Sequence, residues 1–238
     1  MNSFAERLAA VRHRLEQASD RAGRISSEIS LVAVSKTHPP EAVREAVEAG
    51  QTLFGENRVQ EARAKIPLVG VPARWHYIGR LQKNKVRQAL PLFELLHGVD
   101  SAALAADIDR IAGEEGLRPR ILLEVNLAGE TSKIGFTPQD LREQMAEMLR
   151  LQQVQIDGLM TVPPPTEEPE DSRRHFVALR ELRDGLRREF GLRLPELSMG
   201  MSTDYEVAVE EGATLVRVGT ALFGERVGKT WKPAGAEV

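Results

Sequence analysis

The segment ISLVAVSK (Ile29 to Lys36) is rich in β-branched side chains and is almost wholly apolar until its last two residues. This composition is typical of a parallel strand that is buried on both faces. The tripeptide His38-Pro39-Pro40 follows, and proline is well tolerated in the first turn of a helix. An apolar stripe at helical spacing comes next, formed by Ala42, Val43, Ala46 and Val47. The sequence therefore predicts a buried strand followed directly by an amphipathic helix.

The same alternation of strand and helix continues along the chain. Further strands are predicted at Thr52–Phe54, Arg74–Ile78, Leu92–Leu96, Ile121–Leu127, Gln155–Met160, Glu196–Ser198 and Thr214–Val218. Helices are predicted at Arg58–Lys65, Gln82–Leu90, Ser101–Glu115, Gln139–Gln152, Ser172–Phe190 and Tyr205–Glu211. Such alternation indicates parallel βαβ units, and eight strands favour an α/β fold that closes into a single (β/α)8 TIM barrel. An open, doubly wound sheet is the alternative.

An extra helix is predicted before the first strand. Ser3 and Glu6 form a capping-box pattern, and apolar residues follow at helical spacing. No composition shift marks a domain boundary, so we expect one domain over residues 1–238, with a loosely attached polar tail from about residue 229. The proline-rich, acidic segment Pro163–Ser172 lies between a predicted strand and a predicted helix. It is interpreted either as an exposed connection or as a lid.

Composition excludes several classes of protein. The chain has 238 residues, with 32 basic and 35 acidic side chains and a formal charge of −3. No strongly basic domain points to nucleic acid, and no apolar run approaches the roughly 18 residues of a membrane span. Cysteine is absent, which excludes disulfides and thiolate chemistry, and the five histidines lack metal-ligand spacing. We therefore expect a cytoplasmic protein with no nucleic-acid, membrane or metal partner.

Lys36 is the first candidate for chemistry. In a barrel the functional groups lie at the carboxyl ends of the strands, and Lys36 ends the first one. Partial desolvation there favours the neutral amine, which is the nucleophile for Schiff-base formation. The alternative is a lysine that extends from a strand end into water.

The second candidate is a phosphate-binding loop. The segment Ser198–Thr203 joins a predicted strand to a helix, and Thr203 with Glu206 forms a possible capping box. Gly219 and Thr220 follow the last strand. Barrels often bind phosphate with the loops after strands seven and eight, because helix amino ends favour anions. An ordinary capped helix after a turn is the alternative.

Arg217 is the third candidate. Strand alternation places it on one face with Leu215 and Gly219, so an inward-facing arginine would reach the barrel mouth. A buried guanidinium needs a partner, and an ion pair with a nearby acid such as Glu124 is the alternative to a binding role. His76 and Asn57 are weaker candidates, since a histidine in a strand is commonly a hydrogen-bonded structural residue.

Six blocks of sequence together resemble a known family. They are VAVSKTHP (32–39), LFGENRVQEA (53–62), WHYIGRLQKNK (75–85), EVNLAGETSKIGF (124–136), GLMTVPP (158–164) and LSMGMSTDYEVAVEEGATLVRVGTALFGER (197–226). In order and over essentially the whole chain, these blocks are similar to the pyridoxal phosphate homeostasis proteins. The resemblance implies a barrel of the alanine racemase N-terminal type, called fold type III among pyridoxal phosphate proteins.

The resemblance also implies a cofactor and its ligands. Pyridoxal 5′-phosphate would form an internal aldimine with Lys36, and Arg217 would face its pyridine nitrogen. The phosphate would be held by Ser202, Thr203, Gly219 and Thr220. The remaining expected neighbours are Asn57, Met199 and Met201 near the cofactor face and His76 in the pocket wall.

The function implied is that of a regulator or carrier of pyridoxal phosphate, which tunes vitamin B6 and amino-acid pools without strong catalysis. Arginine stays charged, so it cannot protonate the ring nitrogen, and the cofactor becomes a weak electron sink. Apo forms of pyridoxal phosphate enzymes are the expected recipients, and a monomer is expected. A pyridoxal phosphate-dependent racemase or lyase is the alternative. A barrel enzyme on a phosphorylated sugar, with Lys36 as an aldolase-type nucleophile, is a weaker one.

Overall fold

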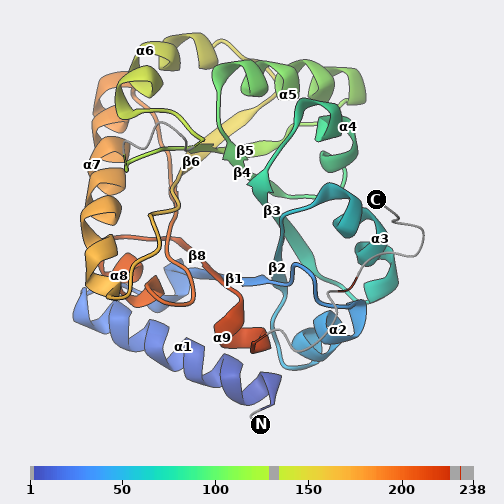
Figure 1. The fold of residues 1–238 in the computed structure, drawn as a ribbon. Helices are drawn as coiled ribbons and strands as arrows, with labels where there is room; N and C mark the ends of the chain where they lie inside the picture. Colours follow the sequence, from blue (N-terminus) through green and yellow to red (C-terminus); the bar gives the residue numbers. More distant parts are fainter. Residues whose placement is uncertain (1–2, 129–133, 226–230, 232–238) are drawn as a thin grey trace.

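Eight parallel strands form a closed barrel in chain order, which confirms the predicted TIM barrel and excludes an open sheet. The computed structural model describes residues 3–128, 134–225 and 231. Figure 1 looks along the barrel, with the helices around the outside of the strands. Closure depends on β8 pairing with β1, in register from Ser30 opposite Leu215 to Ala33 opposite Val218. The first and last strands therefore lie side by side.

The strands are short, as is usual in a barrel of this type. They are β1 (Ser30–Val34), β2 (Leu53–Glu56), β3 (Arg74–Arg80), β4 (Leu95–Val99), β5 (Arg120–Glu124), β6 (Gln155–Met160), β7 (Glu196–Ser198) and β8 (Leu215–Val218). All eight predicted strands overlap these positions. The predicted position of β4 is wrong by three residues, because the chain from Val86 to Leu92 still forms helical turns.

The helices between the strands also match the predicted alternation. They are α1 (Phe4–Arg21), α2 (Pro40–Glu48), α3 (Val59–Val69), α4 (Val86–Ala89), α5 (Ala102–Glu115), α6 (Pro138–Met148), α7 (Arg173–Phe190), α8 (Tyr205–Glu210) and α9 (Thr220–Phe223). Short 3₁₀ turns are η1 (Ser26–Glu28), η2 (Lys83–Lys85) and η3 (Pro169–Ser172). Sequence did not predict α9. The predicted capping box of α1 is confirmed, since Ser3 and Glu6 each bind the other's backbone N–H.

Side-chain alternation divides the apolar core into two parts. Inside the barrel lies a small cluster of Val32, Leu53, Leu95, Leu122, Met160 and Leu215. A larger cluster lies outside the strands, under the helices, and it includes Val216 and Val218. Because Leu215 is inside and its neighbour Val216 is outside, Arg217 is directed inward, which meets the condition for it to reach the barrel mouth.

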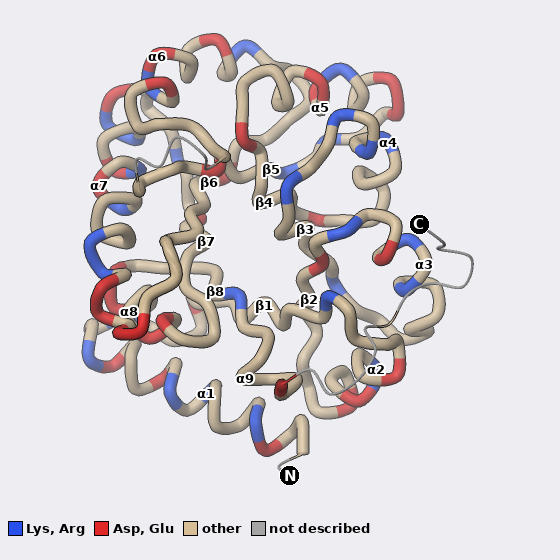
Figure 2. Tube along the Cα trace, in the orientation of Figure 1, with Lys and Arg blue, Asp and Glu red and all other residues tan. Residues whose placement is uncertain are grey.

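Charged residues lie mostly on the ring of helices (Figure 2). Some of those on α1 join this helix to the carboxyl-terminal part of the barrel. Arg21 of α1 pairs with Glu210 of α8, and Arg7 donates a hydrogen bond to the carbonyl of Leu222 in α9. The extra amino-terminal helix therefore covers α8 and α9, whose preceding loops carry the predicted phosphate-binding residues.

Two predictions remain open. The loose tail from residue 229 lies outside the described residues except for Trp231, whose backbone N–H donates to the carbonyl of Thr37 at 2.9 Å. The segment Pro163–Ser172 is a mostly exposed connection that ends in η3, which leaves its role as a lid untested. Among the described helices, none combines the length and the apolar character that crossing a membrane requires.

Candidate functional site

A pocket of about 390 Å³ lies at the carboxyl ends of the strands, at the mouth of the barrel. It brings together most of the predicted site residues, namely Lys36, Asn57, Met201, Ser202, Thr203, Arg217, Gly219 and Thr220. These residues come from the ends of β1, β2, β7 and β8 and from the loops that follow them. The closure of β8 against β1 brings Arg217 and Lys36 to one wall, although they lie far apart in the chain.

The composition of the lining indicates an anionic ligand with an apolar body. Lys36 and Arg217 supply basic side chains, His38 and Asn57 are polar, and no Asp or Glu is among the described lining residues. Apolar walls come from Val34, Ile78, Val162 and Met201. A mostly apolar cleft with a few placed polar groups is typical of a cofactor site.

The residues on either side of Lys36 are held by a buried ion cluster. Lys65 has no exposed side-chain area, and its Nζ lies 2.8 Å from Oε1 of Glu56 and 2.8 Å from Oε1 of Glu61. The same Nζ donates to the carbonyl of Ser35 at 2.9 Å, and the Ser35 hydroxyl donates to Glu56 at 2.7 Å. The Thr37 N–H donates to Glu61. Both neighbours of Lys36 are thus bound to one cluster of three charged side chains, Ser35 through Lys65 and Glu56 and Thr37 through Glu61.

The cluster also fixes an unusual backbone at Thr37, whose φ of 67° lies in the left-handed region. Trp231 adds to this arrangement, because its ring lies over the Lys65 ammonium at 5.4 Å. Burial raises the pKa of Glu56, while the charge and hydrogen bond of Lys65 oppose that rise. One oxygen of Glu56, Oε2, is buried without a hydrogen-bond partner in the described structure.

Arg217 is buried, and its hydrogen bonds go to neutral oxygen atoms. It donates to the hydroxyl of Ser198 and, at 2.9 Å, to the carbonyl of Thr161. Burial lowers its pKa to about 10, and the charges of Glu124 and Asp204 oppose that change. No ion pair joins Glu124 to Arg217 among the described residues, so the alternative of a direct ion pair is wrong.

The loop after β7 is shaped by Gly200. Its φ is +89°, and an added Cβ would lie 2.5 Å from Cβ of Ala208, so glycine is required there. Asp204 closes the turn by accepting the N–H of Met201 at 2.7 Å. The predicted capping box of Thr203 is wrong, because Asp204 precedes α8 and no side chain caps that helix. Thr203 is left exposed at the pocket rim.

The Ser202 hydroxyl links the two predicted phosphate loops. Its Oγ accepts the backbone N–H of Gly219 at 3.2 Å and that of Ala221 at 3.4 Å. Ser202, Thr203 and Thr220 therefore place hydroxyls at one end of the pocket beside the start of α9. This donor set suits a phosphate, since hydroxyl and backbone N–H groups bind anions.

Two predicted residues lie outside the pocket lining. Met199 is fully buried in the cluster under the helices, and His76 is buried inside the barrel, where its Nδ1 lies 3.0 Å from Nε2 of His97. His97 has no role in the sequence analysis, because β4 was placed too early to include it. Lys65 was missed as well, although its spacing of four residues from Glu61 could have indicated an ion pair.

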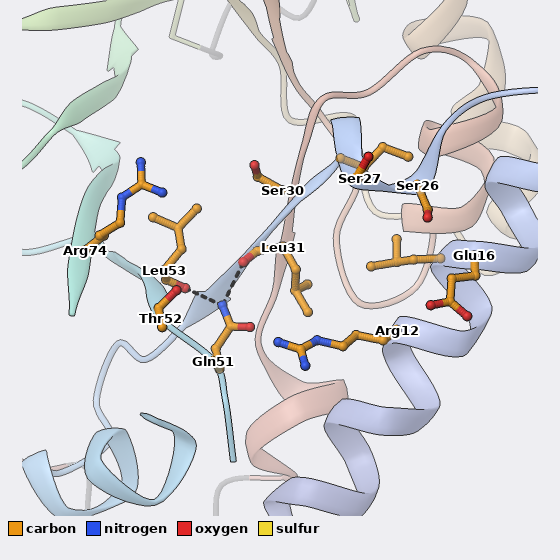
Figure 3. A pocket seen from close by; sticks show the side chains of 12 residues that line it. Arg12, Glu16, Ser26, Ser27, Ser30, Leu31, Gln51, Thr52, Leu53 and Arg74 are labelled. Atoms are coloured by element: carbon orange, nitrogen blue, oxygen red, sulfur yellow. Dashed lines mark hydrogen bonds between the residues drawn. The ribbon is translucent and has the colours of Figure 1, made fainter. Parts of the chain in front are cut away.

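A second pocket, of about 360 Å³, lies at the opposite end of the barrel (Figure 3). Most of its polar side chains are exposed, including Arg12 and Arg74. Gln51 is buried there, and its amide donates to the carbonyls of Leu31 and Leu53 at 2.8 and 2.7 Å, as the dashed lines show. Since this end of a barrel commonly serves stability, we assign it no chemistry. Among the described residues, no three His, Asp or Glu side chains could hold a metal ion.

Comparison with known proteins now decides the family. Residues 7–227 match the model of the alanine racemase N-terminal domain. The pyridoxal phosphate homeostasis protein of Aquifex aeolicus is 48% identical over 222 residues, which cover 93% of this chain and 97% of that protein. The chain belongs to the pyridoxal phosphate homeostasis proteins. A relative of that name from Pseudomonas aeruginosa is 43% identical, over 95% of this chain and 97% of that protein.

Solved structures agree with this membership and confirm the resemblance seen in the sequence blocks. The structure of PipY from Synechococcus elongatus with pyridoxal phosphate bound has a TM-score of 0.82 and 46% identity, and it covers 93% of this chain and all of that one. An alanine racemase of Clostridium difficile is only 16% identical, with a TM-score of 0.69 over 92% of this chain and 57% of that one. The latter likeness supports the fold alone.

Removing the buried ammonium is expected to destabilise the fold strongly. Lys65→Met leaves Glu56 and Glu61 buried without their cation, and breaking a buried pair from one side costs about 3–5 kcal/mol. Urea unfolding measures this loss. Lys83→Met is the matched control, because the Lys83 side chain is 72% exposed in its pair with Asp107, and its effect should stay within about 0.5 kcal/mol. Equal effects of the two variants would contradict the assigned role.

Glu124 is expected to make stability depend on pH. Burial, assisted by the charge of Asp100, raises the pKa of Glu124 from 4.5 to about 7, while Arg217 and Arg80 oppose the rise. The folded state therefore keeps a proton that the unfolded state has lost, and stability falls as pH rises from about 4.5 to 7. Glu124→Gln imitates the protonated group, so it should gain stability relative to the unmodified protein between pH 5 and pH 8. A constant difference in unfolding free energy across that range would contradict this assignment.

Proposed function

We propose that this chain binds pyridoxal 5′-phosphate in the pocket at the barrel mouth and serves in pyridoxal phosphate homeostasis. The observation that carries the proposal is the lining, which combines Lys36, Arg217 and a group of hydroxyls with apolar walls and no described carboxylate. Pyridoxal phosphate is an anionic phosphate on an apolar aromatic ring, so it fits this chemistry. The relative PipY, with 46% identity over the whole of its chain, has a structure with pyridoxal phosphate bound.

Each group of pocket residues has its own role in the proposal. Pyridoxal phosphate supplies an aldehyde, which condenses with a primary amine with loss of water, and Lys36 is the lysine of the lining. Ser202, Thr203, Gly219 and Thr220 would hold the phosphate. Asn57 and Met201 would contact the ring, and Arg217 would donate a hydrogen bond to the ring nitrogen. Met199 and His76 would act from outside the lining, Met199 by supporting the loop after β7.

The proposal favours a regulator or carrier over a racemase. Arg217 donates only, so it supports an unprotonated ring nitrogen and a weak electron sink. Racemisation needs a second acid or base facing the substrate. The Tyr77 hydroxyl donates to backbone carbonyls, at 3.1 Å to Asn57 and 3.0 Å to Arg80, and Tyr205 is buried outside the lining. Rapid exchange of the α-proton of L-alanine in heavy water would favour the racemase or lyase alternative.

The remaining parts of the proposal concern how the protein works in the cell. We propose that it acts in the cytoplasm as a monomer and delivers pyridoxal phosphate to apo enzymes that need it. The names of its relatives, which are pyridoxal phosphate homeostasis proteins, support the role in homeostasis.

Chemical trapping tests the binding residue. Borohydride reduction of the protein mixed with pyridoxal phosphate should leave a stable pyridoxyl group on Lys36, which peptide mapping locates. Lys36→Ala should lose this modification and the visible absorption band while keeping its thermal unfolding temperature. Lys83→Ala is the control, because Lys83 is exposed and lies away from the pocket. A modification found mainly at other lysines would overturn the proposed site.

Transfer to an acceptor tests the carrier role. The loaded protein, freed of unbound cofactor, is mixed with an apo enzyme that requires pyridoxal phosphate, and recovery of that enzyme's activity is followed over time. Activation should be faster than with free cofactor at the concentration that the loaded protein releases alone. Equal rates would show simple dissociation and would contradict direct delivery.

A further inference from the structure

A chain of hydrogen bonds runs from Arg217 through the inside of the barrel. Arg217 on β8 donates through Nη1 to Oγ of Ser198 on β7. The same Oγ lies 2.8 Å from Nδ1 of His97 on β4, and Nε2 of His97 lies 3.0 Å from Nδ1 of His76 on β3. Nε2 of His76 is buried without a partner in the described structure. The chain thus connects the pocket wall to the opposite side of the barrel interior.

Arginine sets the direction of this chain. A guanidinium can only donate, so Ser198 Oγ must accept from Arg217. The Ser198 hydroxyl proton is then free to be donated to Nδ1 of His97. His97 in turn carries its proton on Nε2 and donates it to Nδ1 of His76, whose own proton is on Nε2.

The opposite arrangement of the two histidines is poorer. If His97 carried its proton on Nδ1, Ser198 Oγ would accept twice, and the buried hydroxyl proton would have no described acceptor. The lone pair of His76 Nε2 would also stay unsatisfied, so two groups would lack partners instead of one. An unsatisfied buried donor is costly, and the first arrangement is favoured.

The surroundings keep both histidines neutral. Burial lowers the pKa of His76 to about 3, with smaller contributions from the charges of Arg74 and Arg120. Burial also lowers the pKa of His97 well below its usual value, with the neighbouring His76 ring and the charge of Arg217 acting in the same direction. The interior cluster beside the two histidines is apolar, and the Glu124 carboxyl acts on Arg217 through its charge. A neutral chain cannot cancel the charge of Arg217.

We infer that Ser198, His97 and His76 are positioning residues, which hold Arg217 as a fixed cationic donor facing the ring nitrogen of a bound pyridoxal phosphate. This inference rests on the proposed function. Ser198 and the Thr161 carbonyl together fix the plane of the guanidinium, because each accepts from a different terminal nitrogen. His97 is needed because it takes the Ser198 proton and so keeps the oxygen lone pair turned toward Arg217. A carboxylate in place of this chain would neutralise Arg217.

The arrangement of protons can be observed without cofactor. In protein labelled with ¹⁵N in histidine, long-range ¹H–¹⁵N spectra distinguish protonated from unprotonated ring nitrogens. We expect both His97 and His76 to be protonated on Nε2 alone, between pH 6 and pH 9. A His97 signal protonated on Nδ1, or on both nitrogens, would overturn the inference.

Substitutions then test the link to the pocket. Ser198→Ala and His97→Leu should weaken pyridoxal phosphate binding about tenfold and shift the visible absorption band, since Arg217 loses a fixed acceptor. His97→Gln can accept from Ser198 and donate to His76, so it should restore most of the affinity and the band. Ser19→Ala is the matched control, because the Ser19 hydroxyl is buried in α1 and its one hydrogen bond within the described part of the chain goes to the carbonyl of Leu15.

The results separate this inference from the proposed function. If the unmodified protein fails to bind pyridoxal phosphate, the proposed function fails, while the histidine spectra still decide the direction of the chain. If it binds and the Ser198 and His97 variants bind equally well with an unshifted band, the inference is overturned and the proposed function stands. Where Ser198→Ala does not fold, the comparison of His97→Leu with His97→Gln gives the same decision.

Discussion

The buried ammonium of Lys65 is the interaction on which the site depends. It joins α3 to the end of β2 through Glu56 and to the end of β1 through the Ser35 carbonyl, and it also binds Glu61 of its own helix. Two carboxylates and one ammonium are costly to bury, and they are retained here where the chain leaves the first strand. Because Ser35 and Thr37 are both held by this cluster, the backbone of Lys36 has little freedom. The side chain of Lys36 therefore enters the pocket from a fixed position of the backbone.

The two cations of the pocket are supported in different ways. The backbone around Lys36 is fixed by charged groups, whereas Arg217 is fixed by neutral ones, through Ser198 and the Thr161 carbonyl. The hydrogen-bond partners of Arg217 carry no charge that would cancel its own. Burial lowers the pKa of its guanidinium to about 10, so it stays protonated at neutral pH. The consequence is a site whose described lining is positive on one wall, carries hydroxyl groups at one end and is apolar at Val34, Ile78, Val162 and Met201. That difference favours a ligand with an anionic end and a flat, uncharged ring.

Much of this could be predicted from the sequence, and the failures have physical causes. Apolar runs separated by helical stretches predict a barrel, and the residues at strand ends predict most of the pocket lining. The position of β4 fails because Leu92 and Phe93 look like strand residues, while the true strand continues through His97 and Gly98. Glycine is needed at Gly98, where a Cβ would lie 2.3 Å from the carbonyl of Gly79. Tertiary contacts of this kind leave no local signal in the sequence, and the spacing of Lys65 from Glu61 indicates an ion pair but not its burial.

The pairing of β1 with β8 determines when the pocket forms as well as its shape. Lys36 lies near the start of the chain and Arg217 near its end, and they share a wall only after the last strand has paired with the first. A nascent chain on the ribosome therefore carries Lys36 long before it carries Arg217. Until translation reaches the eighth strand, no ligand that requires both groups can be retained. A pocket with both side chains on one wall thus forms only after the eighth strand has been added.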